Sequence, residues 1–253
     1  IARDLNSLGM VYNSWDQYDK AINCFEEALA INKRLGMETD VAVCLNNMGL
    51  VYDSWGHYDR AIKYYEEALV TDRGLENEAG IAISLNNIGM VYNAWGKNDK
   101  AIACFEQALA KNNSLGQDDQ VAITLNNIGY VYDSWGQYDK AIEYYEKALV
   151  IDNKLGREAS IAEDLNNIGM VYDSYGLYDK AITYFEEALS ENERMKIDYQ
   201  VATNLNNIGS ACNSVGHYDK AIEYYEEALN IDKRLGRKSD IALDLNNIGA
   251  VYN

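Results

Sequence analysis

The sequence predicts an all-α fold, a solenoid of stacked antiparallel helical hairpins, and three observations lead to this prediction. A forty-residue block recurs six times, as 1–40, 41–80, 81–120, 121–160, 161–200 and 201–240, and residues 241–253 begin a seventh. Within each block, apolar residues recur at helical spacing in two stretches separated by a short turn. Hairpins this short cannot bury their apolar faces alone, so neighbouring hairpins must stack. We therefore expect a single solenoid over residues 1–253.

The fourth block shows the two expected helices. The first covers 121–135 and ends at Gly136, and the second covers 138–155. Gly156 is typical of a left-handed C-cap. Ser160 is expected to cap the following first helix through its side chain.

Gly129 has a counterpart in all seven blocks, inside the expected first helix. Glycine in a helix interior costs about 1 kcal/mol relative to alanine. We infer that no side chain fits at this position because the second helix crosses there. Ala141 and Ala148, alanine in all six complete blocks, are the expected facing residues.

Composition narrows the function further. The net charge of −18 argues against nucleic acid and anionic membranes as partners, although solubility alone also accounts for it. No apolar run approaches the length of a membrane helix, and no signal-peptide pattern opens the chain. The four cysteines form no CxxC pair, which favours free thiols in a reducing compartment and a cytoplasmic protein. The absence of an initiator Met favours a segment of a longer protein.

Catalytic constellations are missing from the sequence. His57 and His217 share an interchangeable turn position, and the carboxylates repeat with the block instead of forming one unusual cluster. No phosphate-binding glycine-rich loop is present. We therefore expect a non-enzymatic protein without cofactor or metal.

The small and large residues of the block resemble the signature of the tetratricopeptide repeats, in order and spacing and in all six blocks. In the fourth block they are Leu125, Ile128, Gly129, Tyr132, Ala141, Tyr145 and Ala148. The forty-residue period departs from the usual period of about 34 residues, and proline is absent from the chain. The longer form resembles the repeats of kinesin light chain, Pins-type adaptors and Rap-type peptide receptors. The resemblance implies a right-handed superhelix whose first helices line a concave groove.

A separate face of the first helix carries polar residues, and the family geometry would place this face in the groove. In the fourth block the face holds Ile123, Asn126, Tyr130 and Asp133. Asn126 has an asparagine counterpart in all seven blocks, and its neighbour Asn127 in six. A primary amide both donates and accepts hydrogen bonds, so a ladder of amides can hold the main chain of an extended peptide, while Met and Leu pockets take its side chains.

The predicted peptide-binding residues are these amides and their neighbours on the same face. They are Asn46, Asn47, Asn86, Asn87, Met90, Asn93, Asn126, Asn127, Tyr130, Asp133, Asn166, Asn167, Met170, Asp173, Asn206 and Asn207. Alternatively, the amides bridge adjacent first helices and rigidify the array. We favour ligand contact for the Asn126 column, as the resemblance to kinesin light chain and Rap-type receptors implies, and weigh both roles equally for the Asn127 column.

The groove has little positive charge. Its positions include Val43, Ile83 and Ile123, and only Arg3 is basic, so we expect a neutral or basic protein segment with apolar anchors as the partner. The interpretation is a peptide-binding scaffold, the sensor or adaptor segment of a larger protein. The alternatives are a structural spacer that self-associates head to tail and an enzyme whose catalytic domain lies elsewhere.

A tryptophan column lies at the hairpin turns, formed by Trp15, Trp55, Trp95 and Trp135 and continued by Tyr175 and Val215. Stacking of these rings on a ligand is one interpretation. We favour a hydrophobic seam between neighbouring hairpins.

Overall fold

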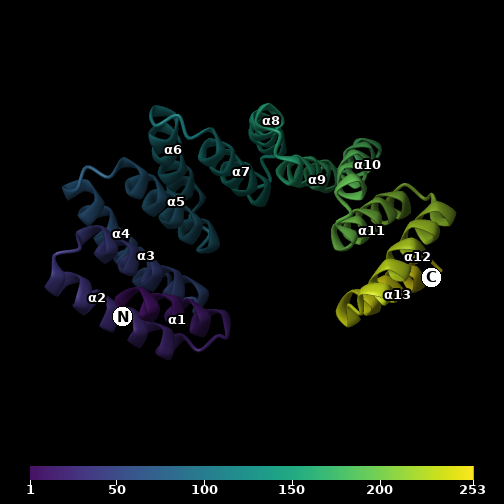
Figure 1. Ribbon diagram of the computed structural model, residues 1–253. Helices are drawn as coiled ribbons and strands as arrows, with labels where there is room; N and C mark the ends of the chain where they lie inside the picture. Colours follow the sequence, from purple (N-terminus) through teal and green to yellow (C-terminus); the bar gives the residue numbers. More distant parts are fainter. Residues whose placement is uncertain (253) are drawn as a thin grey trace. The chain divides into compact units, whose positions relative to one another are not determined.

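The computed structural model describes residues 1–252, and their secondary structure is thirteen helices (Figure 1). The helices are α1 (Ala2–Ser14), α2 (Tyr18–Leu35), α3 (Glu38–Ser54), α4 (Tyr58–Gly74), α5 (Glu78–Ala94), α6 (Asn98–Ser114), α7 (Asp118–Ser134), α8 (Tyr138–Leu155), α9 (Glu158–Ser174), α10 (Tyr178–Met195), α11 (Asp198–Ser214), α12 (Tyr218–Leu235) and α13 (Lys238–Val251). The predicted all-α class of stacked helical hairpins is confirmed.

The chain divides into two compact units, Ile1–Val131 and Tyr132–Asn253. In the first unit, α1 pairs with α2, α3 with α4 and α5 with α6, and α2 and α4 each pack on the next first helix (Figure 1). In the second unit, α9 pairs with α10 and α11 with α12, while α8, α10 and α12 pack on the first helix that follows each of them. A single array over residues 1–253, with its forty-residue boundaries, stays a prediction.

The helix ends correct one expectation and confirm another. The first helices begin about three residues earlier than predicted, so Ser160 lies inside the first turn of α9 and the prediction that it caps this helix was wrong. Gly156 adopts φ 67° at the end of α8, and Gly36 and Gly236 do the same after α2 and α12, which confirms the left-handed C-cap. Lys196 takes this conformation, with φ 59°, after α10.

In five of the first helices, the internal glycine faces an aromatic ring of the second helix. A Cβ atom built on Gly169 would lie 2.6 Å from Cε1 of Phe185, and one on Gly209 would lie 2.8 Å from Cε1 of Tyr225. For Gly249 on α13, no atom of the described residues lies within 4 Å of such a Cβ position. The close approach is therefore confirmed, although the nearest atoms belong to an aromatic ring and not to the expected alanines. The rings are Phe25, Tyr65, Phe105, Phe185 and Tyr225.

Candidate peptide-binding face

One face of the first helices combines exposed apolar side chains with half-buried amides, and we call it the first-helix face. The exposed apolar side chains are Val43, Ile83, Met90, Ile123, Tyr130 and Met170. The amides of Asn46, Asn86, Asn126, Asn166 and Asn206 and of their C-terminal neighbours are half-buried among them. The predicted site residues therefore occupy one kind of surface, repeated from helix to helix within each unit.

In four of the pairs, the first asparagine joins consecutive first helices. We call these residues, Asn6 to Asn246 at forty-residue intervals, the first Asn column. Each bond connects the column to a buried polar residue 38 positions later. In chain order, Ser84 Oγ donates to Asn46 Oδ1 (3.2 Å), Asn86 Nδ2 donates to Thr124 Oγ1 (3.1 Å), Asn204 Nδ2 donates to Asn166 Oδ1 (3.1 Å) and Asn206 Nδ2 donates to Asp244 Oδ1 (2.7 Å). The first Asn column thus bridges neighbouring repeats.

The second asparagine of each pair, which forms the second Asn column, behaves differently along the chain. Asn47 donates to Asn6 (3.1 Å) and Asn207 donates to Asn166 (2.9 Å), so the ends of the column also bridge repeats. In the middle of the chain, no side-chain hydrogen bond joins Asn87, Asn127 or Asn167 to any other described residue. These three half-buried amides keep their donors and acceptors for other partners.

Beneath the first Asn column lies a row of buried polar pairs that sequence analysis missed. Each pair consists of a residue near the end of a second helix and a residue in the middle of the following first helix, twelve positions later, and we call it a junction. The six junctions are Asn32 with Cys44, Asp72 with Ser84, Asn112 with Thr124, Asp152 with Asp164, Asn192 with Asn204 and Asp232 with Asp244, and all these residues are less than 5% exposed. The regular alternation of Asn and Asp in the first position was the signal available in the sequence.

Three junctions carry only neutral groups, and we call them amide junctions. Asn192 Nδ2 donates to Asn204 Oδ1 at 2.8 Å. Asn112 Nδ2 donates to Thr124 Oγ1 at 3.3 Å, and Asn32 Nδ2 lies 3.4 Å from the sulfur of Cys44. A buried amide with a partner of this kind is satisfied without charge.

The other three are acid junctions, and two of them contain an arginine. The carboxylate of Asp152 lies 3.3 Å from Arg157, and that of Asp232 lies 3.1 Å from Arg237. Burial raises the pKa of both carboxyls, and the arginines act in the opposite direction. Asp232 is also hydrogen-bonded to Asp244, whose pKa burial likewise raises. Two carboxyl groups this close favour sharing one proton.

The helix cap places the residue that compensates each acid. The backbone N–H of Arg157 donates to the carbonyl of Asp152 (3.0 Å), five residues earlier, across the left-handed Gly156. The N–H of Asn77 bonds to the carbonyl of Asp72 (2.9 Å) in the same way. This six-to-one bond is the Schellman pattern, and it keeps the two side chains near each other.

A groove of about 370 Å³ lies between α3 and α5 on the first-helix face. Val43, Asn46 and Leu50 line it from α3, and Gly80, Ile83 and Asn87 line it from α5, together with Asp72 and Asn77. Gly80 stands where the other complete blocks carry larger residues, namely Asp40, Gln120, Ser160, Gln200 and Asp240. The groove has the size and the mixed polar and apolar lining of a ligand pocket.

The remaining predicted site residues lie at the edges of the same face. Met90, Tyr130 and Met170 are exposed, whereas Asn93 is half-buried. Asp133 and Asp173 are half-buried too, and burial raises the pKa of each carboxyl.

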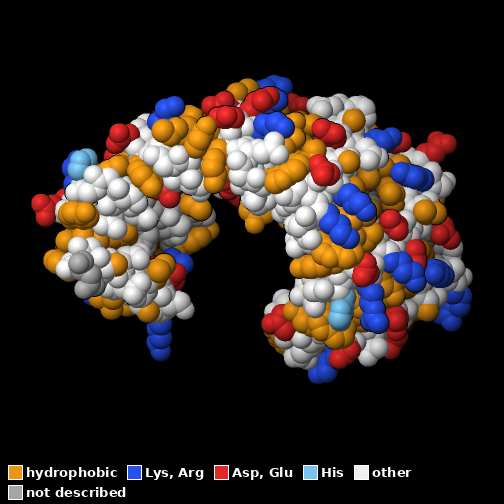
Figure 2. Space-filling view, turned by 180° about the vertical axis from the view of Figure 1, so that it is seen from behind, with side chains coloured by type: hydrophobic (Ala, Val, Ile, Leu, Met, Phe, Trp, Pro, Cys, Tyr) orange, Lys and Arg blue, Asp and Glu red, His pale blue; other side chains and the backbone are white. Residues whose placement is uncertain are grey.

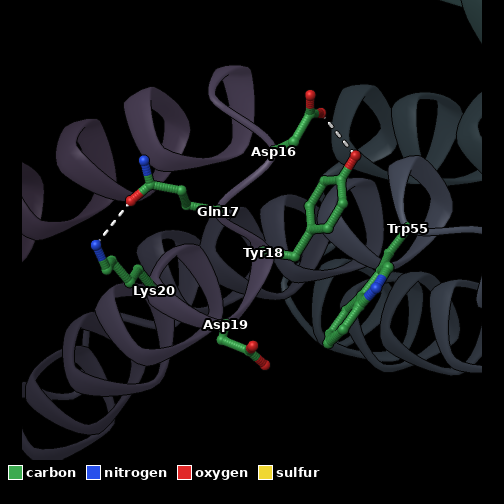
Figure 3. A pocket seen from close by; sticks show the side chains of 6 residues that line it. All are labelled: Asp16, Gln17, Tyr18, Asp19, Lys20 and Trp55. Carbon is green, nitrogen blue, oxygen red and sulfur yellow. Dashed lines mark hydrogen bonds between the residues drawn. The ribbon is translucent and has the colours of Figure 1, made fainter.

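The tryptophan column makes contacts between neighbouring hairpins. The ring of Tyr18 stacks on Trp55 with 5.5 Å between centroids, and its hydroxyl donates to Asp16 (2.7 Å) beside a surface hollow of about 520 Å³ (Figure 3). The rings of Tyr58 and Trp95 also meet, in a tilted arrangement with 6.0 Å between centroids. These ring contacts form the seam expected at the hairpin turns.

Charge and thiol chemistry give no further site on the described residues. On the face shown in Figure 2, Lys and Arg side chains are interspersed with Asp and Glu. All four cysteines are free thiols, and burial raises the pKa of those of Cys44 and Cys212. No group of three or more metal-ligating side chains occurs within residues 1–252. In that same range, no helix has the length and apolar character needed to cross a membrane.

Solved structures with the same fold include several repeat proteins. BtubC (BKLC) from P. vanneervenii superposes with a TM-score of 0.78 at 22% identity, covering 87% of this chain and 92% of its own. A putative kinesin light chain from Podosopora anserina has a TM-score of 0.63 at 17% identity, covering 76% of this chain and 95% of its own. The Rap protein complexed with Competence and Sporulation Factor has a TM-score of 0.67 at 16% identity, covering 98% of this chain and 74% of its own. The apo form of the quorum sensor NprR from B. thuringiensis has a TM-score of 0.68 at 19% identity, covering 95% of this chain and 68% of its own.

At the level of sequence, no curated protein matches the chain significantly. The family model of the tetratricopeptide repeat matches residues 2–70, 80–154, 136–190 and 200–253. These segments together span most of the chain and coincide with the helical hairpins described above. The chain therefore belongs to the tetratricopeptide-repeat family.

Proposed function

We propose that the chain is a non-enzymatic scaffold that binds an extended protein segment along the first-helix face. The groove between α3 and α5 carries this proposal, because a partner-free amide, Asn87, lies there beside Val43, Leu50 and Ile83. The amide suits the N–H and C=O groups of a peptide main chain, and the apolar residues suit its side chains.

The bonds of the first Asn column support binding by preorganisation. Each bridge between first helices fixes the spacing at which successive repeats present their second asparagine. A surface that is already ordered loses less conformational entropy when a peptide binds. In this proposal the first Asn column mainly positions the site within each unit. Asn87 and Asn127 in the first unit, and Asn167 in the second, are the amides available to a peptide main chain.

Two relatives support a sensor or adaptor role. The Rap structure is a complex with Competence and Sporulation Factor, and NprR is a quorum sensor. Family membership favours protein interaction as the role of this chain as well. The half-buried acids on the face and the net charge of −18 favour a neutral or basic segment with apolar anchors.

A peptide-display screen against the complete 253-residue chain tests the proposal. Selected peptides are titrated calorimetrically against the wild type, Asn87→Ala and Asn127→Ala. Asn113→Ala, which removes an exposed amide at the end of α6, is the matched control. Asn87→Ala and Asn127→Ala should each weaken binding by about fivefold to tenfold, as loss of a hydrogen bond predicts, with an unchanged circular dichroism spectrum. If Asn87→Ala and Asn127→Ala bind the peptides as tightly as the control Asn113→Ala, the proposal is contradicted.

A self-associating spacer is the second candidate, and it is favoured by the near-identity of the forty-residue blocks. Repeats of this kind pack on their neighbours through similar surfaces, which can also join one copy of the chain to another. Light scattering over a concentration series should then show growth into oligomers, and a constant monomer mass would exclude it.

A further inference from the structure

Asp72 is a buried acid without the cation that its counterparts possess. Asp152 and Asp232 pair with Arg157 and Arg237, each placed by the six-to-one bond of its helix cap. At Asp72 the same position holds Asn77, whose Nδ2 donates to Asp72 Oδ1 at 2.7 Å. Within residues 1–252, no lysine or arginine lies within ion-pair distance of this carboxylate. A buried carboxylate is best stabilised by a cation, so Asp72 is incompletely compensated.

The space beside this carboxylate is open to the groove. Asp72 is 2% exposed, yet it lines the groove between α3 and α5 together with Asn77 and Gly80. A Cβ atom at Gly80 would lie 2.4 Å from Cγ of Asp72, so any other residue would displace the carboxylate. Glycine at this position, alone among the six complete blocks, therefore lets the acid border the groove.

We propose that this groove is a pocket for an arginine side chain of the bound protein segment, with its guanidinium paired to Asp72. The aliphatic part of the side chain lies against Val43, Leu50 and Ile83. The ligand thereby supplies the charge that Arg157 and Arg237 supply inside the other acid junctions. This inference rests on the proposed function and names the residue that the groove selects.

Charge and size both favour an arginine. The planar guanidinium can form paired hydrogen bonds to a carboxylate, which a neutral side chain cannot reproduce. The groove, at about 370 Å³, falls within the range of pockets for small ligands. A net charge of −18 further attracts a basic segment before contact.

Two peptides that differ only in charge test the pocket on the complete chain. The probes are acetyl-Leu-Thr-Arg-Thr-Leu-amide and its analogue with citrulline, a neutral isostere, in place of arginine. Binding is followed by ¹⁵N nuclear magnetic resonance. The arginine peptide should bind about tenfold more tightly than the citrulline peptide, with shifts at the amides of Asn77 and Gly80.

Two variants that copy other repeats identify the contact. Asp72→Asn copies Asn112, and Asn77→Arg copies Arg157 and fills the pocket from within. Each should abolish the preference for arginine over citrulline. Gln117→Arg, at the position of Asn77 in the next repeat, faces an amide instead of an acid and should leave the preference intact. Circular dichroism checks that every variant is folded.

The outcomes separate this inference from the proposed function. Equal affinity for the two peptides, including binding by neither, overturns the arginine pocket, as does a preference that survives both Asp72→Asn and Asn77→Arg. The proposed peptide-binding function is then tested separately, by the affinity of the display-selected peptides for the wild type and for Asn87→Ala. Lysine in place of arginine should bind more weakly than arginine, and an equal or higher affinity overturns the assignment to a guanidinium.

Discussion

Amide junctions and acid junctions have the same backbone arrangement, but only the acid junctions bury a carboxyl group. Both place a polar residue of the second helix under the following first helix, and both end the second helix with a six-to-one bond. In the amide junctions the residue five positions later is Met37, Gln117 or Ile197, whereas in the acid junctions it is Asn77, Arg157 or Arg237. Compensation for a buried charge is therefore encoded locally, one helix cap away from the charge.

The largest expected effect comes from removing the cation of an acid junction. Arg157→Gln copies Gln117 but leaves Asp152 and Asp164 without their cation. An uncompensated buried charge should lower the free energy of unfolding by about 2–3 kcal/mol at pH 7, less than for a fully buried pair because Arg157 is partly exposed. Urea unfolding followed by circular dichroism measures it. Gln117→Met, at an amide junction, is the control. An equal loss of stability in this variant would show that Arg157 does not act by compensating a buried charge.

Conversion of an amide junction into an acid junction should cost slightly less. Asn32→Asp introduces a carboxylate beside Met37 and Cys44, where no cation compensates it, and should destabilise the chain by about 2 kcal/mol at pH 7. The double variant Asn32→Asp with Met37→Arg should recover most of this loss, because it reproduces the pair of Asp152 with Arg157. Failure of the arginine to rescue would show that the helix cap does not position it.

The paired carboxyls predict a dependence on pH. Burial raises the pKa of Asp232 and Asp244, so the folded chain binds more protons than the unfolded chain at mildly acidic pH. Their contribution to stability is therefore present at low pH and is lost as pH rises through the raised pKa values. Asp244→Asn should add about 1 kcal/mol at pH 7 and flatten this dependence. Urea midpoints between pH 4 and pH 8 measure it, and a slope equal to the wild type would contradict the shared proton.

The smallest expected effect concerns the sulfur of an amide junction. Cys44→Ser replaces a weak acceptor, 3.4 Å from Asn32 Nδ2, with the hydroxyl that Ser84 provides in the next junction. The stronger hydrogen bond should add about 0.5 kcal/mol. Thermal unfolding of Cys44→Ser and Cys44→Ala separates the contribution of this hydrogen bond from that of packing. If the serine variant is no more stable than the alanine variant, the hydrogen bond is absent.

Sequence periodicity was sufficient to predict the helical hairpins. The apolar stripes and Gly156 reflect the geometry of single helices, and these features are local. The aromatic contact of Gly169 was predicted only as a close approach, since the ring of Phe185 reaches it from another helix. Peptide binding by Asn46, Asn126 or Asn206 stays a prediction, whereas the bridges that the first Asn column makes are observed.

The repeated sequence pattern was therefore sufficient to predict the all-α class and the positions of the repeated amides, because helix formation depends on neighbours within one or two turns. The starts of the first helices and the cap at Ser160 were not predicted correctly. The separation of bridging asparagines from the partner-free Asn87 emerged only when the repeats were stacked. So did the pairing of Asp152 with Arg157 and the absence of a cation at Asp72. A polar side chain takes its role from whichever groups packing brings within about 3 Å, and those groups lie in other helices and across helix caps.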